Sequence, residues 1–301
     1  MRSAAGWRSG RLPETVAGAV RARDARRKVG CVTSIRDLVR AASATLAGAG
    51  CETPRLDAEL LLASTLGVGR ERLVIDASIS LPAAKQELFD ELVARRVARE
   101  PVAYILGRKE FRRITLSVDR RALIPRPETE LLVEFGLGLA PGARVLDVGT
   151  GSGAVALALK DERPDLSIAG VDVDADALAL ARLNACRLGA SDVRFVRSDL
   201  LLGVSGELDA VLANLPYVAN GTPLAPEIAL YEPASALLAG PDGLDVVRRL
   251  TAMLAKVPIV ALELGAGQAP AVSELLRGAG YSSIERLRDL AGYERVVVGR
   301  R

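Results

Sequence analysis

The sequence predicts an α/β protein: a small N-terminal helical bundle, then a seven-stranded, mostly parallel sheet closed at one edge by a C-terminal antiparallel hairpin. Three observations support this fold class. Apolar residues recur with a helical period up to about residue 100, short apolar strands alternate with helical segments from residue 144, and two strand-like runs flank Gly292. Strands that alternate with helices are typical of a parallel sheet covered on both faces.

The first 30 residues differ in composition from the rest of the chain. The formal net charge is +3, and residues 1–30 contribute +6 of it, so residues 31–301 carry −3. Residues 1–30 are rich in arginine and lack a clean apolar period, which predicts a disordered tail or a misassigned translation start. The mildly acidic remainder argues against a broad phosphate-binding surface.

Composition also limits the chemistry. Histidine is absent, which excludes histidine general bases, Ser-His triads and imidazole metal ligands. Cys31, Cys51 and Cys186 are far apart, odd in number and without C-x-x-C spacing, so neither a disulfide framework nor a metal site is predicted. No run approaches the ~20 apolar residues of a membrane span, and no apolar signal core is present, so we expect a cytoplasmic protein.

Residues 31–100 are predicted to form the helical bundle. A first helix follows Thr33 or Ser34 as N-cap. A second runs from Pro54 to Gly67, and a third opens at Pro82. The side chains that the period places inward are Ile35, Leu38, Val39, Ala42 and Leu46 in the first helix, and Leu88, Phe89, Leu92 and Val93 in the third. A bundle of this size is marginal alone, so we expect it to rest against its neighbour.

Residues 101–122 are predicted to form a connecting hairpin that turns near Gly107, and residues 123–301 the larger α/β domain. The proline-punctuated run "LIPRPETE" opens that domain. Its predicted strands are residues 144–149, 167–174, 193–199, 209–216, 258–264, 282–290 and 294–300. In an open sheet of this kind, ligands bind at the carboxyl ends of the strands.

A glycine-rich loop follows the first of these strands, in "LDVGTGSGAVALAL". Glycines at alternate positions remove side chains where the backbone turns sharply and a ligand must come close. The cofactor contacts predicted here are Gly149, Thr150, Gly151, Ser152 and Gly153. The same run satisfies the G-x-G-x-x-A pattern of dinucleotide-binding folds, which leaves a nicotinamide-dependent oxidoreductase as an alternative.

Acidic residues at the strand ends narrow the choice of cofactor. Asp172 ends the second strand, where a carboxylate can accept both hydroxyls of a ribose through charge-assisted bonds. Asp147 adds a second negative charge, which disfavours the pyrophosphate of a dinucleotide. S-adenosylmethionine fits better, because it brings a ribose, two cationic groups and a carboxylate suited to the helix N-terminus. Asp199 and Leu200, after the third strand, are predicted to flank its adenine.

The fourth strand ends in "ANLPY". Its tip neighbours that of the first strand in the usual order of such sheets, so Asn214 would project into the same crevice and also contact the cofactor. The Asn214 side-chain oxygen and the Leu215 carbonyl would accept hydrogen bonds from a planar amide or amine and hold its nitrogen in line with the methyl donor. Pro216 fixes the bend, and Tyr217 offers a flat wall. The predicted catalytic residues are Asn214, Pro216 and Tyr217, and the predicted substrate contacts are Asn214 to Tyr217.

Six segments resemble, in matching order, those of the peptide chain release factor N(5)-glutamine methyltransferases, the HemK/PrmC family. They are "EPVAYILGRKEF" (100–111), "LIPRPETELLVE" (123–134), "DVGTGSGAVALAL" (147–159), "NLPY" (214–217), "YEPASALLAGPDGLDVVRRL" (231–250) and "RDLAGYERVVVGR" (288–300). The resemblance implies a Rossmann-like class I S-adenosylmethionine-dependent methyltransferase. Its substrate would be the glutamine of the Gly-Gly-Gln loop in class 1 release factors, which the helical N-terminal domain helps to seat. It also implies cofactor contacts at 149–153, Asp172, Leu200 and Asn214, and substrate contacts at 214–217.

One position departs from the family pattern, because Leu215 stands where Asn-Pro-Pro-Tyr has its first proline. Asn-Leu-Pro-Tyr also occurs in rRNA adenine dimethyltransferases, so an adenine N6 methyltransferase acting on a flipped base of rRNA or DNA stays an alternative. A ribosomal-protein glutamine methyltransferase is another. Residues 31–301 are acidic and hold only nine aromatic residues, so we do not expect direct nucleic-acid binding. A non-catalytic module that docks on a release factor is disfavoured by Asn214.

Overall fold

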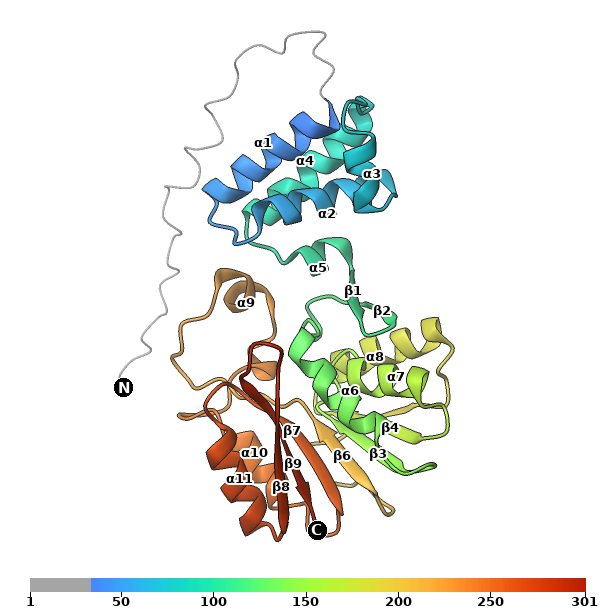
Figure 1. Cartoon of the computed structure of the whole chain (residues 1–301), viewed down its shortest axis with the longest axis vertical. Coiled ribbons are helices and arrows are strands. Elements are labelled where there is room, and N and C mark those ends of the chain that lie inside the picture. Colours follow the sequence, from blue (N-terminus) through green and yellow to red (C-terminus); the bar gives the residue numbers. More distant parts are fainter. Residues whose placement is uncertain (1–33) are drawn as a thin grey trace, which may run out of the picture.

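The computed structural model describes residues 34–301, and in it a helical bundle sits above a larger α/β domain (Figure 1). The predicted tail, residues 1–30, lies outside the described residues, as does Thr33. The bundle helices are α1 (Ile35–Gly48), α2 (Pro54–Leu66), α3 (Arg70–Ile75) and α4 (Ala83–Val97). Of these, α3 was not expected from the sequence.

Local signals fix the ends of the bundle helices. Ser34 is the N-cap of α1, and its side chain accepts a hydrogen bond from the Asp37 N–H at 3.2 Å. Gly67, with φ 74°, ends α2 in the left-handed conformation that glycine adopts without strain. The predicted inward position of Leu88 is wrong: this side chain is 41% exposed, whereas its neighbour Phe89 is 1% exposed. Adjacent helical residues point about 100° apart, so only one of them faces the bundle core.

The segment between the two parts differs from the predicted hairpin. Residues Val102–Leu106 form a single helical turn, α5, which Gly107 ends with φ 67°. A hairpin does follow, with strands β1 (Arg108–Phe111) and β2 (Ile114–Ser117), but it turns at Arg112 and Arg113. The helical turn buries Tyr104 in the core of the larger domain and Ile105 in the core of the bundle. The Tyr104 hydroxyl also donates a 2.7 Å hydrogen bond to the Ala122 carbonyl.

The larger domain contains the predicted seven-stranded sheet, in the order β5-β4-β3-β6-β7-β9-β8. Strands β5, β4, β3, β6 and β7 pair in parallel, and β9 and β8 are antiparallel. The strands are β3 (Arg144–Val148), β4 (Ser167–Asp172), β5 (Arg194–Arg197), β6 (Ala210–Ala213), β7 (Ile259–Glu263), β8 (Ser283–Arg288) and β9 (Glu294–Arg300). The C-terminal hairpin thus closes one edge of the sheet, as the sequence predicts.

Helices cover both faces of this sheet (Figure 1). One face packs against α6 (Glu130–Leu137), α7 (Ala154–Glu162) and α8 (Ala175–Leu188), and the other against α10 (Asp245–Thr251) and α11 (Ala269–Gly278). A short helix, α9 (Pro226–Tyr231), lies in the long segment between β6 and β7 and reaches the bundle. None of the helices in the described part combines the length and apolar character that crossing a membrane requires.

The register of the four central parallel strands places their ends level with one another. Val148 of β3 pairs with Val171 of β4 and Ala213 of β6, and Ala213 pairs in turn with Leu262 of β7. The next residue along each strand therefore falls in one row across the sheet. In the order of the strands, this row is Asp172, Gly149, Asn214 and Glu263.

A buried ion-pair network joins the bundle to α9. Arg96 of α4 is 5% exposed and pairs with Asp57 of α2 at 2.7 Å and with Glu227 of α9 at 2.9 Å. Glu227 also pairs with Arg99 at 2.6 Å. The Tyr231 hydroxyl adds a hydrogen bond to the Ala98 carbonyl at 2.8 Å. The bundle therefore rests on the larger domain through charged groups as well as through α5.

Substitution of Asp57 by alanine is expected to lower the free energy of unfolding by about 3 kcal/mol, because it removes one partner from a buried arginine. Urea denaturation of the full chain measures this change. Glu274→Ala, which removes an exposed partner of Arg277, is the matched control and should cost no more than about 0.5 kcal/mol. Equal midpoints for the two variants would contradict a stabilising role of the network.

Candidate active site

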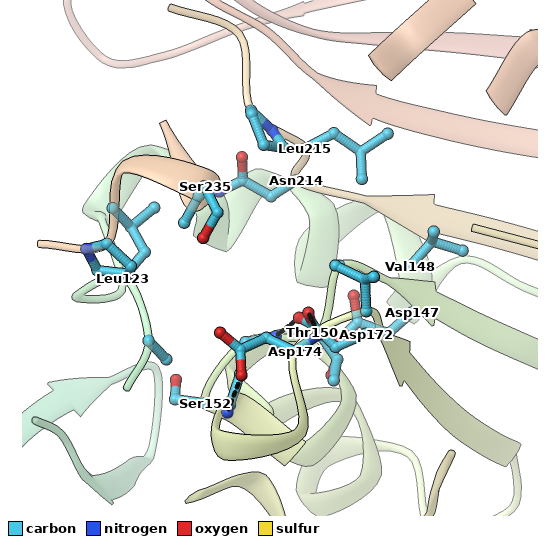
Figure 2. Close-up of a pocket in the computed structure, with 18 of the residues that line it drawn as sticks. Leu123, Asp147, Val148, Thr150, Ser152, Asp172, Asp174, Asn214, Leu215 and Ser235 are labelled. Atoms are coloured by element: carbon cyan, nitrogen blue, oxygen red, sulfur yellow. Dashed lines mark hydrogen bonds between the residues drawn. The ribbon is translucent and has the colours of Figure 1, made fainter. Parts of the chain in front are cut away.

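A cleft of about 340 Å³ opens at the row of strand ends (Figure 2). Its lining includes most of the residues that the sequence singles out: Asp147, Gly149, Thr150, Gly151, Ser152, Asp172, Asp199, Leu200, Asn214, Leu215 and Pro216. Figure 2 shows Thr150, Ser152 and Asp172 on one side of it and Asn214 and Leu215 on the other. The volume lies within the range of small-molecule sites. The predicted residues Gly153 and Tyr217 are not among its lining.

The three glycines of the loop, Gly149, Gly151 and Gly153, have different structural roles. Gly149 and Gly151 line the cleft with φ of 73° and 54°. A Cβ on Gly149 would lie 3.0 Å from Leu215 Cδ2, so glycine here lets residues 214–217, the acceptor loop that follows β6, approach closely. A Cβ on Gly151 would meet only Ala122, at 3.8 Å. Gly153 has φ 84°, and its Cβ would crowd Leu157 and other apolar side chains. Its absent side chain therefore serves the packing of α7 on the sheet.

Asp147 holds the glycine loop in place. Its carboxylate accepts the Thr150 hydroxyl at 2.6 Å and the Ala156 N–H at 3.2 Å. The group is buried, and desolvation raises its pKa to about 6, although both hydrogen bonds oppose that rise. These bonds tie Asp147 to the loop and to the first turn of α7. Asp147 therefore has a structural role in the loop, besides the negative charge that disfavours a pyrophosphate.

Asp172 is preorganised by the backbone around it. One carboxylate oxygen accepts the Gly151 N–H at 2.9 Å and the other accepts the Asp174 N–H at 3.0 Å. Burial raises its pKa, and these two hydrogen bonds oppose the rise. Each oxygen keeps a further lone pair, because a carboxylate has about four acceptor sites. Asp172 can therefore accept two hydroxyl groups from a ligand in the cleft without giving up its backbone bonds.

Asp199 and Leu200 line the cleft at the end of β5. Asp199 pairs with Arg249 of α10 at 2.5 Å, a contact that the sequence did not indicate. Leu200 has φ 53°, a left-handed conformation that non-glycine residues rarely adopt, and its side chain is buried in the core on the α10 side. Backbone strain of this kind persists where packing imposes it and is frequent at ligand sites. Leu200 is therefore mostly buried in this core, although it also contributes to the cleft lining.

In the acceptor loop after β6, neither Asn214 Oδ1 nor the Leu215 carbonyl has a hydrogen-bond partner among residues 34–301. The nitrogen of the Asn214 amide is occupied, because it donates to Thr129 Oγ1 at 3.0 Å. Leu215 is 4% exposed, and its side chain packs against the glycine loop. That packing holds the backbone of Leu215 where the family pattern has a proline.

Tyr217 lies just beyond the cleft. Its ring packs at Gly265, where a Cβ would lie 3.3 Å from Tyr217 Cδ2, and its carbonyl accepts from Gln268 Nε2 at 3.0 Å. Burial, and secondarily the negative charge of Glu263, raises the pKa of Tyr217 to about 12. The phenol is therefore neutral at physiological pH.

Two residues near Asn214 were missed by reasoning from the sequence. Thr129, just before α6, lines the cleft, and Glu263 at the end of β7 lies 2% exposed in the row of strand ends. A signal for Glu263 was present, because one carboxylate interrupts the otherwise apolar run "PIVALEL". Charged side chains are almost never fully buried without a specific role or partner.

These features fit S-adenosylmethionine. Asp172 offers paired acceptors for ribose hydroxyls, Leu200 an apolar face for the adenine, and Gly149 and Gly151 a backbone free of side chains. The fold also matches the crystal structure of the hMettl16 catalytic domain in complex with a MAT2A 3′UTR hairpin, with a TM-score of 0.54, 17% identity, and coverage of 70% of this chain and 82% of that one. Fold and cleft together define a class I S-adenosylmethionine-dependent methyltransferase.

Comparison with known sequences narrows this class. The PrmC N-terminal domain model matches residues 37–107, and the methyltransferase small domain model matches residues 127–240. The release factor glutamine methyltransferase of Deinococcus radiodurans is 40% identical over 89% of this chain and 98% of its own length. The release factor glutamine methyltransferase of Caulobacter vibrioides is 37% identical over 86% of this chain and 93% of its own length. The chain belongs to the release factor glutamine methyltransferase family.

Asp172→Ala is expected to weaken S-adenosylmethionine binding roughly 100-fold, because two charge-assisted hydrogen bonds of ~1.5–3 kcal/mol each are lost and partly replaced by water. Titration calorimetry of the full chain measures the dissociation constant. Asp192→Ala, an exposed partner of Lys160 outside the cleft, is the control and should bind as the parent does. An unchanged dissociation constant in the Asp172 variant would remove it from the cofactor site.

Proposed function

We propose that this chain transfers the methyl group of S-adenosylmethionine to the side-chain amide nitrogen of the glutamine in the Gly-Gly-Gln motif of class 1 release factors. One observation carries the proposal. Asn214 Oδ1 and the Leu215 carbonyl, on consecutive residues beside the glycine loop of the same cleft, are acceptors without a partner in the described part of the chain. Two acceptors match the two N–H bonds of a primary carboxamide. The names of the D. radiodurans and C. vibrioides relatives support the choice of substrate.

For this methyl transfer, the main role of the protein is to position the substrate amide nitrogen. A carboxamide nitrogen is a weak nucleophile because its lone pair is delocalised into the carbonyl. Hydrogen bonds from its N–H groups to Asn214 Oδ1 and the Leu215 carbonyl raise electron density on nitrogen and aim it. Bound S-adenosylmethionine supplies an electrophilic methyl group on sulfur. That group would pass to the substrate nitrogen with the sulfide as leaving group, and the nitrogen would lose its proton to water, so the reaction needs no histidine base.

Pro216 and Tyr217 would complete the substrate side. Pro216 lines the cleft and fixes φ of the bend after the acceptor carbonyl. Tyr217 backs the loop, and we infer that its neutral ring limits where a planar amide can lie. The replacement of the usual proline by Leu215 is offset by burial of the leucine side chain against the loop of Gly149.

The helical bundle would help to seat the release factor, as the family resemblance implies. Its contact with α9 supports this proposal, because α9 lies between the acceptor loop and β7 in the chain. Direct contact with nucleic acid is not part of the proposal, since residues 31–301 carry a net charge of −3. Substrates of the translation machinery would place the enzyme in the cytoplasm.

Labelled S-adenosylmethionine offered with a release factor, a ribosomal protein or an rRNA separates the proposal from its alternatives. Label is expected in the release factor, on a peptide that contains Gly-Gly-Gln and gains the mass of one methyl group. Fragmentation of that peptide locates the methyl on the glutamine amide. Label in the ribosomal protein or the rRNA alone would overturn the proposal in favour of the corresponding alternative.

Asn214→Ala is expected to lower turnover ~10²–10³-fold, the loss that follows removal of one preorganised polar group. Cofactor affinity should change much less, because the free oxygen of Asn214 faces the reacting amide. Single-turnover kinetics and calorimetry measure the two quantities. Asn220→Ala, an exposed residue further along the same segment, is the control. A turnover equal to that of the parent would exclude Asn214 from the mechanism.

A further inference from the structure

Glu263 is a buried acid that the chemistry above does not use. It ends β7 one position after Leu262, so it stands in the row of strand ends beside Asn214. The residue is 2% exposed, and its Oε2 atom has no hydrogen-bond partner among the described residues. An unsatisfied buried carboxylate oxygen is costly to stability, so native proteins keep one where it serves a purpose.

Thr129 lies between Glu263 and the acceptor loop. It is 4% exposed, at the start of α6, the helix that packs over β6 and β7. Its hydroxyl oxygen accepts a hydrogen bond from Asn214 Nδ2 at 3.0 Å. On its other side lies the Glu263 carboxyl, whose pKa Thr129 lowers against the effect of burial.

Among residues 34–301 the proton of the Thr129 hydroxyl is not engaged in another hydrogen bond, so it can be donated to the neighbouring Glu263 carboxylate. A hydroxyl has a single proton, so when Thr129 donates it to the Glu263 carboxylate, the oxygen is left to accept from the next group. That group is the amide nitrogen of Asn214, which leaves the amide oxygen directed to the cleft. Flipping the amide would present N–H groups to the N–H groups of the substrate and break the bond to Thr129.

We propose that Glu263 and Thr129 are positioning residues, which act through a hydrogen-bond relay to hold the Asn214 amide with its oxygen toward the substrate nitrogen. The inference rests on the proposed function, since it concerns how Asn214 is kept ready for the reaction. It assigns a use to the buried carboxylate at the end of β7. Neither residue touches the reacting atoms.

The charge of Glu263 sets the direction of the relay. An ionised carboxylate can only accept, whereas a protonated one can donate to Thr129 and free the threonine proton for Asn214 Oδ1. Burial raises the pKa of Glu263 to about 7, and Glu128 raises it further. Arg126 and Arg295 act to lower it, but they are paired with Glu232 and Asp289. The Tyr217 phenol nearby is neutral at this pH.

A dependence of turnover on pH follows. In the folded protein the Glu263 carboxyl is protonated below about pH 7. In that state it no longer only accepts hydrogen bonds, so the relay does not hold the Asn214 oxygen toward the substrate. Turnover with saturating substrates should therefore rise as the pH increases through about 7. In Glu263→Gln this limb should be absent between pH 6 and 8.5, and turnover at pH 8.5 should fall about 10-fold, by analogy with losing part of a preorganised polar group.

Thr129→Val tests the relay at its centre, because valine keeps the shape of threonine and removes the acceptor. Turnover is expected to fall about 10-fold or more, while the dissociation constant of S-adenosylmethionine stays within about twofold. Thr129→Ser should restore most of the activity. Thr251→Val is the matched control, since Thr251 is buried and donates to the Arg248 carbonyl at 2.9 Å within its own helix.

Two readouts separate positioning from folding. Glu263→Gln should have a melting temperature at pH 8.5 at least equal to that of the parent, because it removes a buried charge. The ¹⁵N resonance of the Asn214 side chain should shift with an apparent pKa near 7 in the parent and not in the glutamine variant. This second measurement uses no substrate, so it does not depend on which protein is methylated.

The outcomes distinguish the inference from the function on which it rests. If Asn214→Ala is inactive and Thr129→Val retains full turnover, the relay is wrong and the proposed function stands. If Asn214→Ala itself is fully active, both are wrong. A pH profile of Glu263→Gln that superimposes on that of the parent would also overturn the relay.

Discussion

The level register of β4, β3, β6 and β7 is the constraint on which the site depends. Parallel pairing of Val148 with both Val171 and Ala213, and of Ala213 with Leu262, brings Asp172, Gly149, Asn214 and Glu263 into one row. A one-residue slip of β6 would turn the Asn214 side chain to the opposite face of the sheet, since successive residues of a strand alternate. The apolar cores on the two faces hold this register, because each strand is buried on both sides.

Three acids of this site, the buried Asp147 and Glu263 and the half-buried Asp172, have separate roles. Asp147 accepts hydrogen bonds from the glycine loop and from the first turn of α7. Asp172 accepts two backbone N–H groups and keeps lone pairs that can accept hydrogen bonds from a ligand. Glu263 lies further along the same row, and one of its oxygens has no partner within residues 34–301. Burial raises the pKa of all three carboxyl groups, so the fold gives up stability to place them. Such concentrations of perturbed carboxyl groups are typical of functional sites.

Much of this fold could be predicted from sequence, because its signals are local. Alternating apolar strands and helices predict the sheet, and caps such as Ser34 and Gly67 mark helix ends. The helical turn α5 was missed, since "VAYIL" before a glycine reads equally well as a strand. Leu88 was predicted to face inward because the helical period alone does not show which of two adjacent apolar residues, Leu88 or Phe89, is buried.

In the candidate site, too, the features that depend on nearby residues could be predicted from the sequence, and the contacts between distant residues could not. The loop at Gly149 and the turn at Asn214 have recognisable spacing along the chain. The link from Asn214 to Thr129 joins residues 85 positions apart, and the pair of Asp199 with Arg249 joins residues 50 apart. No period or motif carries such pairings, because only the tertiary fold brings those side chains together.

The helical turn α5 has a thermodynamic consequence. Its adjacent residues Tyr104 and Ile105 belong to two different hydrophobic cores, and the network of Arg96 and Glu227 ties the same two parts together a short way off. If either part unfolds, the other loses the packing contacts that Tyr104 or Ile105 makes in its core. Heat should thus unfold the bundle and the sheet as one cooperative unit, in which damage to either is felt by the whole chain.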